Sequence, residues 1–333
     1  MLSDKINYYH ETKQKLNNTP AQYKSEFEWL KEIDSLALAN AQMNLQKAFT
    51  NFFTNPKSGF PKFKSKHKNR KSYTTNNQKG SITLENGYLK LPKFAKLIKV
   101  KQHRQIPENY KIKSATISQT PSGKYYASIL CEYENLVHAI EPETFLGLDF
   151  SMKELYVSSD ETSADYPRFF HKSQQKLPRE CRKLSKCVIG SKNHTKQRII
   201  VAKLYEKIAN QRRDFLHKQS RQITNAYDCV CIENLDMKSM AQALNFGKSV
   251  ADNGWGMFTA FSQYKLEETG KKLVKVDKFF ASSQICSCCG YKNSATKDLS
   301  VREWTFPQCD THHDRDVNAA INIKNEGMRL VNA

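Results

Sequence analysis

Residues 279–327 read FFASSQICSCCGYKNSATKDLSVREWTFPQCDTHHDRDVNAAINIKNEG, a stretch that combines clustered cysteines with histidines and acids. Cys286 and Cys289 form a Cys-x-x-Cys knuckle, which Gly290 tightens. A second knuckle follows in WTFPQC, where Phe306 stands in place of a first cysteine and Cys309 is the last. Two such pairs about 15–20 residues apart are typical of zinc sites, so the pattern is three-quarters complete.

Clustered cysteines can also be small buried hydrophobic residues or a redox pair. The polar residues throughout the stretch favour an incomplete zinc-ribbon-like module instead. The fourth ligand stays open between water, Cys288, His312 and His313. Cys288 lies inside the first knuckle and is expected not to turn inward, so His312 or His313 is preferred.

Phe306 decides what we expect of this module. Its ring would stand where a sulfur should point and would push the second knuckle outward. We therefore expect zinc to bind weakly or not at all. On this reasoning Phe306→Cys would raise both the zinc content and the thermal stability.

Composition restricts the class of protein. The chain has 333 residues, a net charge of +20 and a pI near 9.5, which indicates a polyanionic partner. Nine cysteines without a signal-peptide pattern predict reduced thiols in a cytoplasmic protein. No apolar run is long enough to span a bilayer, so no membrane partner is expected.

The N-terminal part, residues 1–70, is predicted to be a helical segment with a basic tail. Asp34 or Ser35 can cap a helix whose apolar residues recur at helical spacing. Seven Lys or Arg and no acid then stand between residue 56 and residue 71, interleaved with aromatic residues. A solvated basic loop is the alternative, but we expect nucleic-acid contacts. The residues proposed for them are Lys62, Lys64, Lys66 and Arg70.

Residues 71–141 are predicted to form an antiparallel β domain. Short β-prone runs at 81–84, 88–91, 98–100, 112–119 and 124–133 are separated by turn residues. That spacing suggests a small barrel or sandwich. Pro142 and its acidic neighbours are expected to form a linker.

The remaining chain alternates strands and helices. Residues 145–151 alternate with period two, which puts Asp149 on the face opposite Leu148, and 153–159 continues a hairpin. Residues 172–226 carry fifteen Lys or Arg against three acids and are expected to form two helices with a basic surface, interrupted at Pro178 and at Gly190-Ser191. Residues 228–234 form a buried strand that ends near Glu233; a helix at 253–269 and a strand at 272–276 follow.

Three acids stand out in these elements: Asp149, Glu233 and Asp316. Asp316 opens a helix on which Ala319 and Ala320 share its face, so that the helix could approach a sheet closely. Carboxylates arranged around one sheet edge could hold two Mg²⁺ ions for phosphodiester hydrolysis. The alternative is that the three acids are solvated or salt-bridged, which is the more common case for acids with this spacing.

The segments LGLDFSMKELYVSSD, CIENLDMKSM and DRDVNAAINIKNEG resemble the three motifs of the RuvC-like nuclease domain of the TnpB (OrfB) family. These insertion-sequence proteins are relatives of the type V CRISPR effectors, and the resemblance covers about residues 25–330. DNGWGMF at 252–258 also resembles a family segment. The resemblance implies that Asp149, Glu233 and Asp316 are the metal-binding acids, with Asp314 less favoured.

The resemblance also implies an α+β, multidomain fold. A helical recognition-like segment (1–70) and a wedge-like β domain (71–141) would precede an RNase H-like, RuvC-type nuclease domain (142–281 plus 310–328). A zinc-ribbon-like insertion (282–309) would interrupt that domain.

The function that the family implies is RNA-guided, Mg²⁺-dependent cleavage of double-stranded DNA, with a guide RNA from the transposon end as partner. A monomer associated with the nucleoid is expected. The chain departs from the family pattern at Phe306, at Asp310 and in an N-terminus that looks short. The alternatives are therefore a repressor that binds DNA without cutting it and an inactive remnant.

Overall fold

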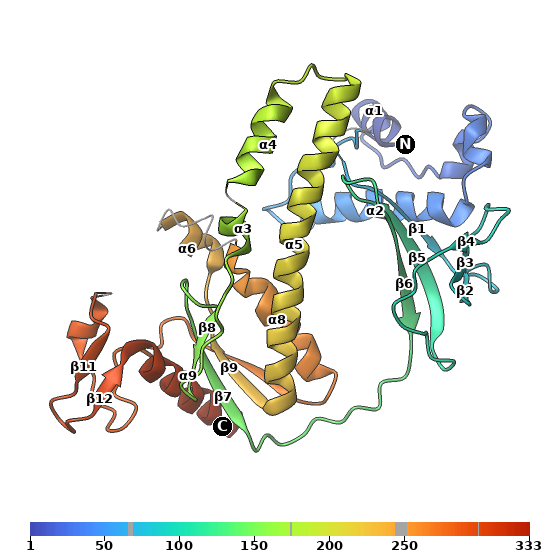
Figure 1. Ribbon diagram of the computed structural model, residues 1–333. Coiled ribbons are helices and arrows are strands. Elements are labelled where there is room, and N and C mark those ends of the chain that lie inside the picture. The colour runs from blue at the N-terminus through green and yellow to red at the C-terminus, as the bar shows by residue number, and fades with distance from the viewer. Residues whose placement is uncertain (66–68, 174, 244–251, 299) are drawn as a thin grey trace. The chain divides into compact units, whose positions relative to one another are not determined.

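The computed structural model describes residues 1–65, 69–173, 175–243, 252–298 and 300–333 (Figure 1). The chain forms two compact units, Met1–Asn135 and Leu136–Ala333, which are described one at a time. This division is coarser than the four predicted segments, whose boundaries stay predictions. Helices and sheets are mixed in both units, as the α+β prediction requires.

The first unit begins with helices. They are α1 (Leu2–Thr12), the 3₁₀ turns η1 (Pro20–Tyr23) and η2 (Glu28–Lys31), and α2 (Ser35–Thr54). Asp34 is the N-cap of α2 and accepts a hydrogen bond from the Ala37 N–H at 3.1 Å. The Thr75 hydroxyl also donates to the Asp34 carboxylate, which links the start of α2 to the following sheet.

Two three-stranded antiparallel sheets complete this unit. One has the order β1 (Lys71–Asn76), β5 (Lys111–Gln119), β6 (Tyr125–Glu132), and the other consists of β2 (Thr83–Glu85), β3 (Tyr88–Lys90) and β4 (Ile98–Lys99). They share an apolar core around Ile82, Leu89 and Ala115. The sequence-based prediction missed β1, because KSYTTN is polar and its strand is stabilised by pairing with β5 and by contact with α2.

The second unit is built on a four-stranded mixed sheet. Its order is β10 (Lys272–Val276), β9 (Cys229–Glu233), β7 (Phe145–Phe150), β8 (Tyr156–Ser158). β9 is parallel to both β7 and β10, whereas β7 and β8 form an antiparallel hairpin. All four strands were predicted from the sequence, with ends that differ by a few residues.

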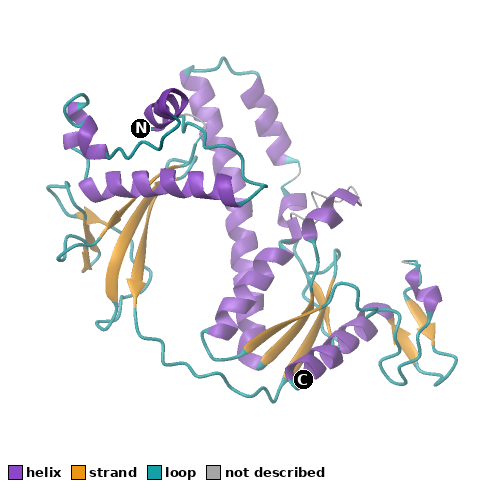
Figure 2. Ribbon diagram, turned by 180° about the vertical axis from the view of Figure 1, so that it is seen from behind, coloured by secondary structure: helices purple, strands orange, loops and turns teal. Residues whose placement is uncertain are grey.

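Helices cover both faces of this sheet (Figure 2). On one face Leu148, Val230 and Ile232 pack against residues of α5 (Lys192–Ala226) and α8 (Trp255–Glu267). On the other face Cys229 and Cys231 pack with Ile323 of α9 (Arg315–Val331). The alternation of side chains along β7 and β9 thus sorts the residues between two helical layers.

The other helices among the described residues are α3 (Phe169–Lys172), α4 (Lys176–Ser185) and α6 (Met237–Ala243). The two basic helices predicted between residues 172 and 226 are α4 and α5. Pro178 does not interrupt either: it lies in the first turn of α4, where the missing N–H costs no helical hydrogen bond. Within the described residues, no helix combines the length and the apolar character that crossing a bilayer requires.

A small module lies between β10 and α9. It contains the 3₁₀ turn η3 (Ser294–Lys297) and the antiparallel pair β11 (Glu303–Thr305) and β12 (His312–Asp314). We call residues 282–314 the cysteine module. Asn318 and Asn322 of α9 donate to the Ile285 carbonyl at 2.8 and 2.6 Å, so the module is attached directly to the last helix.

Candidate active site and metal centre

Asp149 and Glu233 lie at the carboxyl ends of neighbouring parallel strands. Leu148 of β7 pairs with Ile232 of β9, so the next residue on each strand is one of the two acids. Leu148 and Ile232 point to the α5–α8 face. Because side chains alternate, both acids belong to the opposite face, which α9 covers.

Helix α9 approaches that face closely because small residues line the contact. Ala319 and Ala320 are buried, as the sequence predicted. A Cβ atom built on Gly147 of β7 would lie 2.0 Å from the Ala320 carbonyl oxygen and 2.8 Å from the Lys324 amide nitrogen. A Cβ on Gly327 would lie 2.2 Å from Cys231 Sγ. Backbone against backbone, α9 brings its N-terminal Asp316 to the strand ends that carry the other two acids.

The electrostatics of the three carboxyl groups reflect this convergence. Burial raises the pKa of Asp149 well above its ordinary value, and the charges of Asp316 and Glu233 raise it further. Burial also raises the pKa of Glu233. For Asp316 burial raises the pKa, whereas Arg302, 3.6 Å away, acts in the opposite direction. The site concentrates negative charge that a cation would neutralise.

Asp314, the neighbouring acid, accepts hydrogen bonds from backbone amides of α9. It is the N-cap of α9, and its Oδ1 accepts hydrogen bonds from the amides of Asp316 and Val317 at 2.9 Å each. A carboxylate used in this way stabilises the helix start. This role as a cap supports the preference for Asp316 over Asp314 as a member of the acidic cluster, which stays a prediction.

Two buried residues of the DNGWGMF segment, Asp252 and Asn253, make polar contacts that the sequence did not predict. Asn253 donates from Nδ2 to the carbonyls of Ser151, at 3.0 Å, and Glu154, at 3.4 Å, and so holds the turn that follows Asp149. Asp252 forms a 2.7 Å ion pair with Arg212 of α5. In the sequence, the DNGWGMF segment stands out only by its family resemblance. The pair of polar residues directly before an apolar helix is the feature from which buried polar contacts could have been predicted.

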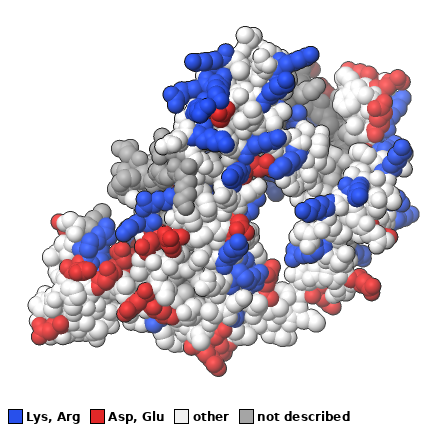
Figure 3. All heavy atoms as spheres, viewed as in Figure 1, with Lys and Arg blue, Asp and Glu red and all other residues white. Residues whose placement is uncertain are grey.

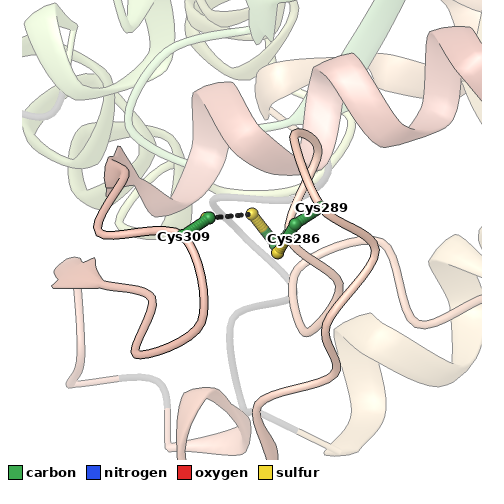
Figure 4. Close-up of side chains that lie close together, drawn as sticks. All are labelled: Cys286, Cys289 and Cys309. Atoms are coloured by element: carbon green, nitrogen blue, oxygen red, sulfur yellow. Dashed lines mark hydrogen bonds between the residues drawn. The ribbon is translucent and has the colours of Figure 1, made fainter.

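The cysteine module brings three sulfurs together (Figure 4). The ligand atoms of Cys286, Cys289 and Cys309 all lie within 4.8 Å of one another. The Sγ atoms of Cys286 and Cys309 are 3.6 Å apart, although the residues are far apart in sequence. Burial raises the pKa of Cys286 to about 11. Hydrogen bonding between Cys309 and Thr311 lowers the pKa of Cys309 to about 7, which favours the thiolate that a metal ion requires.

Of the two candidate histidines, the structure brings one to the sulfurs. His313 is buried, and its Nε2 lies 3.3 Å from Cys286 Sγ. His312 is exposed, beside Glu303. The expectation that Cys288 stays turned away when both neighbouring cysteines bind metal stays a prediction: Cys288 is exposed, although its Sγ lies within 4.8 Å of the ligand atoms of Cys286 and His313.

The prediction that Phe306 pushes the second knuckle outward is wrong, because Cys309 Sγ lies within 4.8 Å of the first-knuckle sulfurs. Phe306 is fully buried and packs with Cys286 and Trp304 in the small core of the module. The Gly290 amide donates to the Cys286 carbonyl in the first knuckle, and the Asp310 amide donates to the Phe306 carbonyl in the second. Phe306 thus takes the backbone position of a first cysteine, while its ring fills the core beside the sulfurs.

Asp310, which departs from the family pattern, takes part in this turn. Its φ is 51°, in the left-handed region where Gly290 of the first knuckle also lies, at 75°. Asp is among the non-glycine residues that tolerate this conformation. The second knuckle therefore keeps its turn without a glycine.

The basic residues proposed for nucleic-acid contact lie in the first unit. Lys62, Lys64 and Arg70 are exposed in the segment between α2 and β1, and Lys66 lies outside the described residues. Phe63 in the same segment is 68% exposed. The described part of this segment is accessible and rich in positive charge, and it carries an exposed aromatic ring.

Comparisons with known proteins agree with this organisation. A family model described as "Probable transposase" (OrfB_IS605) matches residues 128–244, and one described as "Cas12f1-like, TNB domain" matches residues 255–323. A "Putative RNA-guided DNA endonuclease" of Streptomyces pristinaespiralis is 32% identical over 305 residues, which are 91% of this chain and 74% of that protein. A protein of the same description, InsQ of Escherichia coli (strain K12), is 29% identical over 92% of this chain and 78% of its own length.

A solved structure shares the fold. The chain in "Cryo-EM structure of the Cas12f1-sgRNA-target DNA complex" matches with a TM-score of 0.62 at 17% identity. The match covers 97% of this chain and 79% of that one.

Proposed function

Because this chain belongs to the TnpB (OrfB) family of insertion-sequence proteins, we propose that it is an RNA-guided endonuclease that cuts double-stranded DNA. The observation that carries the proposal is the convergence of three carboxyl groups from β7, β9 and α9, where burial and then repulsion by Asp316 and Glu233 raise the pKa of Asp149. Burying several carboxylates together lowers the stability of the fold unless a cation neutralises their charge. Asp149, Glu233 and Asp316 are the residues proposed to carry the reaction.

The donor set fits Mg²⁺, which prefers hard carboxylate oxygens over sulfur or nitrogen. Asp149, Glu233 and Asp316 would hold two such ions. A pair of Mg²⁺ ions supplies Lewis acidity at the scissile phosphate and lowers the pKa of the attacking water.

The residues around the acids position them. Asn253 restrains the turn between Ser151 and Glu154 and thereby the end of β7. Arg315 donates to the carbonyl of Asp298 at 2.8 Å and so joins the cysteine module to the start of α9, next to Asp316. These contacts would keep the three carboxylates at a constant separation while nucleic acid binds and leaves.

The proposed partners are a guide RNA from the transposon end and a double-stranded DNA target. The net charge of +20 and the relatives' descriptions support this proposal. Lys62, Lys64, Lys66 and Arg70 are proposed to contact phosphates. We further propose that the protein works as a monomer in the cytoplasm, associated with the nucleoid.

The proposal is tested by purifying the chain with its flanking transposon-end RNA and assaying a matched plasmid with Mg²⁺. We expect linear product with the matched RNA and none with a scrambled guide. A plasmid that is bound by the complex but never cut would contradict the nuclease and favour a repressor. A chain that binds neither RNA nor plasmid would favour an inactive remnant.

We also propose that the cysteine module can hold one zinc ion despite Phe306. Cys286, Cys289, Cys309 and His313 would supply four donors, the number and type that structural zinc sites use. The buried imidazole of His313 beside Cys286 supports the histidine as the replacement for the missing cysteine. Zinc would connect the two knuckles and stabilise the module next to α9.

His313→Ala is therefore expected to lower the zinc content of the purified protein to below about half of the parental value, since three thiolates leave the tetrahedral set incomplete. Metal analysis after dialysis measures it. His312→Ala is the matched control, because its ring is exposed and should leave zinc content unchanged. Equal zinc in both variants would contradict this ligand assignment.

Phe306→Cys tests the role of the ring. Because Phe306 is fully buried, its loss should lower the stability of the metal-free protein by about 1–3 kcal/mol, the reverse of the sequence-based expectation. Thermal unfolding in the presence of a chelator measures the change. A higher melting temperature without zinc would contradict the packing described here.

A further inference from the structure

The antiparallel pair of α4 and α5 carries a concentration of positive charge that the proposed active site does not use. Over its upper part, Figure 3 shows Lys and Arg gathered with few acids between them. Between residues 176 and 207, which cover α4, the turn after it and the first part of α5, the exposed basic residues are Lys176, Arg179, Arg182, Lys183, Lys186, Lys192, Lys196, Arg198, Lys203 and Lys207. The acids in the same stretch are Glu180, which is buried and bonded to Lys183, and Glu206, which is half-buried.

The charges on α5 are arranged in a stripe. At 3.6 residues per turn, Lys192, Lys196, Lys203 and Lys207 fall within an arc of about 60°. The apolar residues Val201 and Ile208 lie on a different side and pack against Leu177 of α4. The structure pairs none of the four lysines with a carboxylate among the residues it describes. We call these four residues the lysine stripe.

The stripe has the length of a nucleic-acid contact. Fifteen residues of helix rise about 22 Å, which equals about six to seven phosphate steps at 3.4 Å along one strand. The four basic residues of α4 and its C-cap, Lys186, also share one face, within an arc of about 120°, opposite Leu177 and Leu184. Side chains that pack α4 against α5 and side chains that carry charge are thus separated on both helices.

The tip of the pair is apolar and exposed. Val188 is 77% exposed, and Ile189, at 87%, is the most exposed large hydrophobic side chain in the part of the chain that the structure describes. The turn is sharp, with Gly190 at a φ of +88°. Lys186 and Lys192 flank the two apolar residues. Exposing two large apolar side chains to water is unfavourable, and such exposure is typical of a site that contacts an apolar surface of a partner.

We propose that the α4–α5 pair is a nucleic-acid-binding arm, in which the basic faces contact phosphates and the Val188–Ile189 tip packs against bases or sugars. Apolar residues that contact bases beside basic flanks are a known mode of nucleic-acid binding. The charge of the flanks selects a polyanion over an apolar protein surface for the tip. The inference rests on the proposed function only in that it needs a nucleic-acid partner.

The first test replaces the four lysines of the stripe by glutamine. Its control replaces Lys31, Lys113, Lys218 and Arg329, four exposed residues that are each paired with an acid, so that both variants lose the same charge. Binding is measured in the Asp149→Ala background with three probes: transposon-end RNA, duplex DNA and an RNA–DNA hybrid.

We expect the stripe variant to lose at least about tenfold in affinity at 150 mM salt for one or more probes. The slope of log affinity against log salt should decrease by about 3, from about 0.7–0.9 for each lost contact. The probe that is affected identifies the strand that the arm contacts. Affinities and slopes equal to those of the control would overturn the proposal, whether or not the parental chain cuts plasmid.

The second test addresses the tip with Val188→Ser combined with Ile189→Ser. Both side chains are exposed, so the melting temperature should stay unchanged. We expect a three- to tenfold loss of affinity for the same probe, with an unchanged salt slope, because the lost contact is apolar. Unchanged affinity would overturn this part, and a simultaneous shift from dimer to monomer in light scattering would assign the tip to contact between copies of the chain.

Discussion

Replacing Asp149 with alanine is expected to reduce plasmid cleavage about a thousandfold or more and to leave RNA and DNA affinity within about twofold. The carboxylate lies where β7, β9 and α9 meet, and its pKa is raised by burial and, to a smaller extent, by the charges of the two other acids. Removal of a ligand from a two-ion site costs several kcal/mol of transition-state stabilisation, and about 4 kcal/mol corresponds to a thousandfold in rate. Single-turnover cleavage and gel-shift assays on the same preparation measure the two quantities.

The control for this prediction is Asp165→Ala, which removes an exposed carboxylate from the same unit and should leave cleavage unchanged. A further variant, Asp149→Asn, separates a metal-binding role from a structural one. It keeps the shape of the side chain and removes the repulsion, so the metal-free protein should melt at a higher temperature than the parent. Cleavage by Asp149→Ala at the parental rate would refute the assignment of the acids.

Gly147→Ala is expected to lower cleavage about a hundredfold and to destabilise the protein by about 1–3 kcal/mol. The added methyl group would lie 2.0 Å from the Ala320 carbonyl oxygen and 2.8 Å from the Lys324 amide nitrogen, and these two nearest atoms belong to the backbone of α9. A backbone cannot turn aside as a side chain can, so α9 must move away from β7 and carry Asp316 with it. A displacement of about 1 Å is enough to impair a site that depends on three converging carboxylates.

Gly256→Ala is the matched control for this variant. Gly256 lies in α8, and a Cβ atom there would meet no atom within 4 Å. Because alanine is the better helix former, this change should leave cleavage intact and raise stability by about 0.5–1 kcal/mol. Melting temperatures and cleavage rates are measured for both variants. Equal values for Gly147→Ala and Gly256→Ala would contradict the close packing of α9 against β7.

Much of the second unit, Leu136–Ala333, could be predicted from the sequence, because the patterns that indicate its strands and helices lie within a few neighbouring residues. The period-two alternation of residues 145–151 predicted β7, and the apolar residues of 228–234 predicted β9. Ala319 and Ala320 indicated a helix that approaches a sheet, and both are buried against it. The strand β1 was missed because nothing in KSYTTN is apolar enough to indicate burial, and its pairing partner β5 starts 35 residues after β1 ends.

The sequence by itself predicted the four strands of the mixed sheet, the two basic helices and three acids that could form one site. Only the tertiary structure decided which residues meet: Cys286 with His313 rather than His312, Asp314 as a helix cap, and Phe306 as part of a core rather than an obstacle. The physical reason is that periodicity depends on neighbours a few residues away, whereas contact depends on how elements far apart in the chain pack. Gly147 shows this best, since its lack of a side chain acquires a meaning only when the backbone of α9 lies against it.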